Sequence, residues 1–148
     1  MSYGSRIAAW MALAISVGLR LGAAAMPANI VNSGSTNADG FRIAVDRSGA
    51  GEYTVTRRGR GKQEEAPQPI RRTIPDALVR RFYTDLEAAQ PLSELPHRGC
   101  FKSASFGTTL KIEFGDQATP DLSCPEEDAR MQALRTDADD IVKLFQTK

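Results

Sequence analysis

The alternation of apolar and polar residues predicts one β-hairpin early in the chain and another closer to its end. Over 41–45, apolar side chains at every second position alternate with polar or small ones, and the alternation resumes over 53–55 after the turn sequence RSGAG. The run 106–114 shows the longest alternation, and a Gly-Asp pair then leads into a shorter strand over 118–122. A period of two residues is typical of strands that bury one face.

Each predicted hairpin is followed by a segment with helical periodicity. The sequence TIPD at 73–76 supplies a capping threonine, a first-turn proline and a capping-box acid, and SCPE at 123–126 repeats this order with Ser123 as the cap. Pro91 ends the first helix. The two expected buried stripes are Leu78, Phe82, Leu86 and Ala89 in the first helix, and Leu134, Ala138, Ile141 and Phe145 in the second.

This order of elements, ββαββα, predicts an α+β fold. The simplest packing is a four-stranded antiparallel sheet with both helices on its apolar face. The opposite face would remain in water and be open to contact with a partner. Its expected residues are Arg42, Asp46, Thr54, Thr56, Thr109, Lys111 and Glu113.

The N-terminal residues have the three-part layout of a secretory signal peptide. A short segment ending at Arg6 precedes an uncharged, mostly apolar run over 7–19, and small residues follow up to a cleavage site near Met26. The apolar run is shorter than the ~20 residues that span a bilayer, so we expect residues 1–25 to be removed on export. Arg20 is unusual for a signal peptide, and the alternative is a buried or membrane-surface N-terminal helix.

The segment 26–40 is expected to be a flexible tether. From Ala28 onward it reads ANIVNSGSTNADG, which is small, polar and rich in Ser, Asn and Gly. Such a stretch buries too little apolar area to offset the entropy lost on ordering. We therefore place a single folded domain at 41–148.

The two cysteines flank the second predicted hairpin, with Cys100 before it and Cys124 after it. In an exported protein this arrangement predicts a disulfide that pins the loop entering the hairpin to the start of the second helix. In the chain-entropy model, such a bridge contributes about 3–4 kcal/mol. The alternatives are a redox pair or a metal site. They fit less well, because the two cysteines are distant in sequence and the chain has a single histidine.

The net charge of +1 gives no general attraction to nucleic acid or to a membrane surface. We therefore expect no nucleic-acid partner and no stable membrane insertion after leader removal. Charge is nevertheless uneven, with a basic middle and an acidic C-terminal third. The candidates for binding an anion or an acidic partner are Arg57, Arg58, Arg60, Lys62, Arg71 and Arg72. The alternative is that they form a solvated charged loop.

The chain offers no recognisable catalytic or metal-binding set. His97 is the only histidine and lies in a loop. Ser103 or Ser105 could complete a triad with Asp121, but no sharp strand-to-helix elbow presents a serine. The acidic clusters lack the spacing of a calcium loop, and the glycines do not open a helix after a strand. We expect no catalytic residues, no metal and no cofactor.

Two strings resemble motifs of small exported bacterial domains without an established activity. They are KSASFGTTLKIEF (Lys102–Phe114) and TPDLSCP (Thr119–Pro125). The layout of strand pair, basic loop, helix, second strand pair and closing helix is also similar to emfourin-type inhibitors of metalloproteases, which need no disulfide. The resemblance implies an architecture that serves binding rather than catalysis.

We therefore expect a small exported, disulfide-stabilised binding module that is periplasmic or secreted and monomeric. Its partner would be an exported or envelope protein, and protease inhibition is one form that this binding would take. One alternative is a structural or accessory protein of the cell envelope without catalytic activity. Another is a hydrolase that uses His97.

Overall fold

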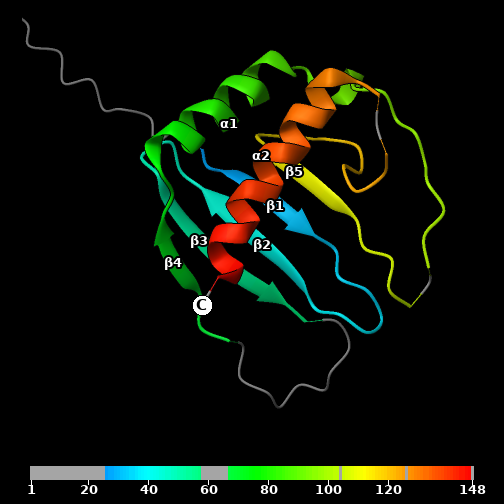
Figure 1. Cartoon of the computed structure of the whole chain (residues 1–148), viewed down its shortest axis with the longest axis horizontal. Helices are drawn as coiled ribbons and strands as arrows, with labels where there is room; N and C mark the ends of the chain where they lie inside the picture. Colours follow the sequence, from blue (N-terminus) through cyan, green and yellow to red (C-terminus); the bar gives the residue numbers. More distant parts are fainter. Residues whose placement is uncertain (1–25, 58–66, 104, 126, 148) are drawn as a thin grey trace, which may run out of the picture.

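The computed structural model describes residues 26–57, 67–103, 105–125 and 127–147. These residues form one antiparallel sheet of six strands in the order β4-β3-β2-β1-β5-β6, together with two α-helices and a short 3-10 helix (Figure 1). The strands are β1 (Ala28–Asn32), β2 (Gly40–Val45), β3 (Ala50–Thr56), β4 (Ile70–Thr73), β5 (Leu110–Phe114) and β6 (Gln117–Ala118). The helices are α1 (Asp76–Ala88), η1 (Leu92–Glu94) and α2 (Ala129–Gln146).

The predicted α+β class and its two helices are confirmed, whereas the predicted four-stranded sheet is wrong. Besides the hairpins β2–β3 and β5–β6, the sheet contains two further strands. Strand β1 lies between the two hairpins, and β4 lies at one edge of the sheet. Strand β4 pairs with β3 at the edge of the sheet, and all four of its residues are exposed. Because an edge strand with no buried face shows no apolar alternation, its sequence carries no strand signal.

Strand β1 corrects the prediction of a flexible tether over 26–40. It lies inside the sheet and pairs with β2 on one side and β5 on the other. Ile30 is fully buried and stands opposite Ile43 of β2 and Ile112 of β5. The backbone of this short strand is hydrogen-bonded on both sides, and its Ile30 is buried. These two contributions stabilise the strand although the residues around it are polar.

The loop between β1 and β2 is also tied to the domain. The backbone N–H of Ser33 donates to Thr109 O at 3.0 Å, and the N–H of Thr109 donates back to Ser33 Oγ at 2.9 Å. Gly34 has a φ of 63°, a conformation that side chains with a Cβ disfavour. This loop therefore continues the contact between β1 and the β5 segment beyond the ends of both strands.

Both helices cover the same face of the sheet (Figure 1). The buried strand residues alternate to one side, and they form a single core with Phe82 and Leu86 of α1 and with Leu134 and Ile141 of α2. At the far end of α2, Arg72 of β4 donates to Leu144 O at 2.5 Å and to Thr147 O at 2.8 Å. A guanidinium group at this position satisfies the last carbonyls of the helix and complements its dipole.

The predicted capping residues are wrong at both helix starts. Thr73 belongs to β4, and α1 begins after Pro75 without a side-chain cap. Helix α2 begins at Ala129, where Asp128 accepts the N–H groups of Arg130 and Met131. Ser123 instead takes part in a hydrogen-bonded cluster five residues upstream of that cap. Neither helix among the described residues is long and apolar enough to cross a membrane.

A buried carboxylate links α1 and α2. Asp137 of α2 is 1% exposed, and its side chain accepts a hydrogen bond from Arg81 of α1, which also binds Asp140 at 2.7 Å. Burial raises the pKa of Asp137 to about 6, and the nearby Asp85 adds to this shift while Arg81 opposes it. The folded protein therefore binds this proton more tightly than the unfolded chain does.

We expect Asp137→Asn to raise the free energy of unfolding at pH 7.5 by about 1–2 kcal/mol. An amide keeps an oxygen acceptor for Arg81 and removes the buried charge. In the wild type, the free energy of unfolding should rise as the pH falls from about 6 towards 4. Over this range Asp137 binds a proton in the folded protein but not in the unfolded chain, because folding raises its pKa from 3.8. Urea unfolding at pH 5 and pH 7.5 measures the difference. A variant that is less stable than the wild type at pH 7.5 would contradict this account.

Candidate functional site

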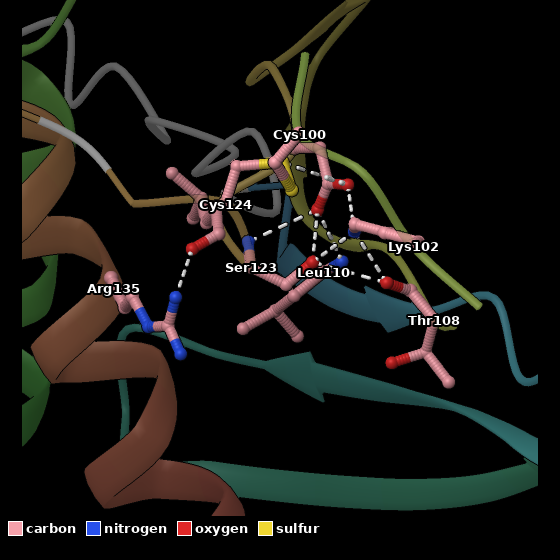
Figure 2. The surroundings of a disulfide bond; sticks show 9 residues. Cys100, Lys102, Thr108, Leu110, Ser123, Cys124 and Arg135 are labelled. Carbon is pink, nitrogen blue, oxygen red and sulfur yellow. Dashed lines mark hydrogen bonds and ion pairs between the residues drawn. A yellow bond between two sulfur atoms is a disulfide. The ribbon is translucent and has the colours of Figure 1, made fainter. Parts of the chain in front are cut away.

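The disulfide predicted between Cys100 and Cys124 is present. It joins the segment after η1 to the segment before α2, with the two Cα atoms 5.5 Å apart. The same region is held to α2 by Arg135, whose guanidinium donates to Leu122 O at 2.8 Å (Figure 2). The bridge therefore anchors a long loop, which runs down one side of the molecule in yellow-green, onto the core (Figure 1).

A cluster of polar side chains lies beside the disulfide, and we call Lys102, Asp121 and Ser123 the lysine cluster. The Lys102 ammonium group donates to Thr108 O at 2.5 Å and also contacts the Asp121 carboxylate and Ser123 Oγ (Figure 2). Asp121 additionally accepts the N–H groups of Leu110 and Ser123, both at 3.0 Å. The ion pair between Lys102 and Asp121 thus lies where three segments meet: the one around Lys102, the one at 108–110 and the one at 121–123.

The electrostatics of the lysine cluster keep its carboxylate ionised. Burial alone would raise the pKa of Asp121, but hydrogen bonds from Lys102, from Ser123 and from two backbone N–H groups outweigh it and lower the pKa to about 2. Lys102 and Asp121 form an ion pair, and Ser123 Oγ lies in contact with both of them, so the arrangement ties the loop to the segment around Ser123.

We expect Asp121→Asn to lower the free energy of unfolding at pH 7 by about 2 kcal/mol, because Lys102 would lose its counterion. The pKa of Asp121 is lowered from 3.8 by folding, so its contribution is present above about pH 4 and is lost as the pH falls towards 2. Urea unfolding of both proteins between pH 2.5 and pH 7 measures this. The two stabilities should converge at the acidic end, and a constant difference across the range would contradict the assignment.

Two phenylalanines project into water from the loop that the disulfide anchors, which we call the anchored loop (described residues 96–103 and 105–107). Phe101 is fully exposed, at 101% of its reference area, and Phe106 is 71% exposed. They border a shallow hollow of about 540 Å³ that the disulfide and Lys102 also line. Phe106 was expected in the strand over 106–114, but β5 begins only at Leu110. The N–H of Gly107 donates to Ser103 O at 2.7 Å, so the chain turns here instead of continuing as a strand.

The backbone around Phe101 is open as well. From Pro96 to Ser103 the chain makes no turn or bend, so it runs in an extended course. The backbone groups of residues 97–101 make no hydrogen bond with any other residue in the described part of the chain. Residues 97–99 are exposed, and Phe101 is exposed while its neighbours Cys100 and Lys102 are half-buried. The loop therefore presents one aromatic side chain and an unpaired strand-like backbone.

The structure describes three of the six predicted anion-binding residues, and each of these three contacts another part of the domain. Arg58, Arg60 and Lys62 lie outside the described residues. Arg71 and Arg72 are neighbours on β4 and point to opposite faces of the sheet. Arg71 pairs with Glu52 at 2.7 Å, Arg72 binds the end of α2, and Arg57 lies 3.9 Å from Asp39. An anion site at this set stays a prediction, although its described members already have internal partners.

The structure also places the four residues that were considered for a hydrolase site. His97 is exposed and makes no hydrogen bond to another described residue, while Asp121 is occupied by Lys102 and Ser123. Ser103 and Ser105 are exposed loop residues. No group of three or more potential metal ligands occurs within residues 26–57, 67–103, 105–125 and 127–147.

Sequence reasoning missed the residues that define the loop. Lys102 and Ser123 are separated by a hairpin, and no local pattern indicates that they meet. The position of Phe101 directly after Cys100 was a usable signal, because a large aromatic residue beside a predicted disulfide is either core or contact surface. No protein-family model and no curated protein matches the sequence. The anchored loop carries Phe101 and Phe106, the two most exposed large hydrophobic side chains among the described residues.

Proposed function

We propose that this protein is an exported protein-binding module whose contact surface is the anchored loop from Pro96 to Gly107. The observation that carries the proposal is the exposure of Phe101 and Phe106 on a loop that is otherwise tied down. The two side chains line the same shallow hollow, and neighbouring exposed apolar groups of this kind are typical of protein contact surfaces. Aromatic side chains also dominate the binding energy of protein interfaces.

The anchoring of this loop favours tight binding. Cys100 is covalently held, and Lys102 is fixed by three acceptors in the cluster beside it. A loop that is already ordered loses little conformational entropy when a partner binds, so more of the contact energy appears as affinity. Phe101 sits between these two fixed points.

Export is part of the proposal, and two observations support it. A disulfide that stabilises a small domain is typical of proteins that work outside the cytosol. The residues before Met26 also have the layout of a signal peptide. We therefore propose a periplasmic or secreted location and an exported or envelope protein as the partner.

A role in binding also fits the chemistry of the loop better than catalysis does. The serine in the lysine cluster faces an ammonium group, and its hydroxyl donates to Asp121 at 2.6 Å and lies 3.0 Å from Thr108 O. Each polar group in the cluster thus satisfies another group in the same cluster. We infer a module without catalytic activity.

Site-specific photocrosslinking tests the proposal. A photoreactive p-benzoylphenylalanine placed at Phe101 should form a defined adduct in the native envelope fraction or culture medium. A matched probe at Lys111, an exposed position on the polar face of β5, should not form that adduct. The adduct should disappear when excess unlabelled wild-type protein competes for the partner.

A competitor that lacks both aromatic side chains tests whether the loop is the contact surface. A Phe101→Ala/Phe106→Ala protein should fail to compete, because both truncated side chains are exposed and their loss leaves the fold intact. If that protein competes as well as the wild type, or if the adduct forms only from Lys111, the loop is not the contact surface.

A further inference from the structure

We propose that residues 96–103 are a substrate-like inhibitory segment for a serine protease that prefers aromatic side chains, with Phe101 as the residue that enters its specificity pocket. This inference rests on the proposed function and deepens it by naming the class of partner. Three observations carry it: the extended open backbone, the exposure of Phe101, and the anchors on both sides of that residue.

The backbone has the form that a protease active site accepts. Residues 96–103 run without a turn or bend, and residues 97–101 have no backbone hydrogen bond to any other described residue. An extended segment with free N–H and C=O groups can pair with a strand of a partner, which supplies affinity through main-chain hydrogen bonds. In such a pairing, side chains that alternate outward provide the specificity.

Phe101 is the side chain that the segment offers. It is fully exposed, whereas its neighbours Cys100 and Lys102 turn towards the domain. A hydrophobic slot, as in chymotrypsin-type enzymes, selects an aromatic residue at this position. The basic side chains nearby are less suited to a pocket for cations, because Lys102 is held in its cluster and Arg98 pairs with Glu127 at 3.2 Å.

The anchors explain why such a segment would inhibit the enzyme instead of being consumed. Hydrolysis of the bond between Phe101 and Lys102 adds one water and leaves a carboxylate on Phe101 and an amine on Lys102. Both fragments would stay joined, because Cys100 is bonded to Cys124 on the other fragment. The Lys102 side chain is also held by Asp121 and Ser123. The new ends therefore remain close, and loss of the same water re-forms the bond.

Inhibition of chymotrypsin, followed with a small chromogenic substrate, tests this inference. The oxidised wild-type protein should inhibit the enzyme stoichiometrically at micromolar concentration or below. Phe101→Ala and Phe101→Asp should raise the inhibition constant about 100-fold, the loss expected for the central residue of an interface. Phe101→Leu should retain inhibition to within about tenfold, because a leucine also fits a hydrophobic slot.

The matched control is Lys111→Ala, which truncates an exposed side chain on the polar face of β5, outside the loop, and should leave the inhibition constant unchanged. Any cleavage should occur first after Phe101. The product should run as a single band without reductant and as two bands with it, one beginning at Lys102. Absence of inhibition by the wild type, equal effects of the alanine changes at 101 and 111, or first cleavage elsewhere would each overturn the inference.

The two proposals fail separately. If chymotrypsin is unaffected while the photoreactive group at Phe101 still captures a partner in competition with the wild type, the loop binds a protein of another class. In that case the inference is wrong and the proposed function stands. If the captured adduct is also absent, both are wrong.

Discussion

Replacement of both cysteines by alanine is expected to lower the free energy of unfolding by about 3 kcal/mol. The disulfide joins residues separated by 24 positions in sequence and closes the loop that contains β5 and β6. In the chain-entropy model, a loop of this length restricts the unfolded chain by about that amount. This is a large share of the roughly 5–15 kcal/mol by which domains of this size are stable. Urea unfolding monitored by circular dichroism measures the change.

Chemical reduction provides the control for this prediction. Reductant should destabilise the wild type to about the level of the Cys100→Ala/Cys124→Ala protein and should have no effect on that variant. The loop should also become more accessible to proteases around Phe101, since one of its two anchors is gone. Equal stability of the oxidised and reduced wild type would contradict a stabilising bridge.

Ile30→Ala is expected to cost about 4 kcal/mol, because it removes a fully buried side chain from a strand inside the sheet. The side chain stands between Ile43 and Ile112, and its loss leaves a cavity that neither neighbouring strand can fill without breaking its register. Urea unfolding again gives the measurement. This effect tests whether the segment first expected to be a tether carries the core.

The matched control is Val31→Ala, one position further along the same strand. Val31 is half-buried and points to the polar face of the sheet, so its truncation should cost about 1 kcal/mol or less. Similar small effects at both positions would mean that β1 is not held between β2 and β5.

The elements predicted correctly are those with a local signal. The β2–β3 hairpin combines apolar alternation with the turn around Gly49, whose φ is 90°, and both helices have a continuous apolar stripe. Strand β1 lacked such a signal, because its five residues lie among Ser, Asn and Gly and its partners are distant in sequence. Strand β4 reads as part of a charged loop because none of its side chains is buried.

The same distinction applies to the site. The disulfide followed from the count and positions of the cysteines, and its presence is confirmed. The lysine cluster joins residues that are 19 and 21 positions apart, so a local pattern could not show it. Phe106 was misplaced because alternation continued through the sequence SFGTTL, although the turn at Gly107 separates it from β5. Exposure of Phe101 depends on the direction in which the disulfide holds the chain, which only the tertiary structure provides.

The position of β1 determines when folding can be completed. It is the first of the described strands in chain order, yet one of its two partners is β5, whose Ile112 pairs with Ile30 across more than half of the sequence. Pairing between residues so far apart in sequence closes slowly and only after the whole intervening chain is present. Until β5 emerges, the edge of β1 lacks a partner and Ile30 stays partly in water. The six-stranded sheet can therefore close only after β5 has been synthesised.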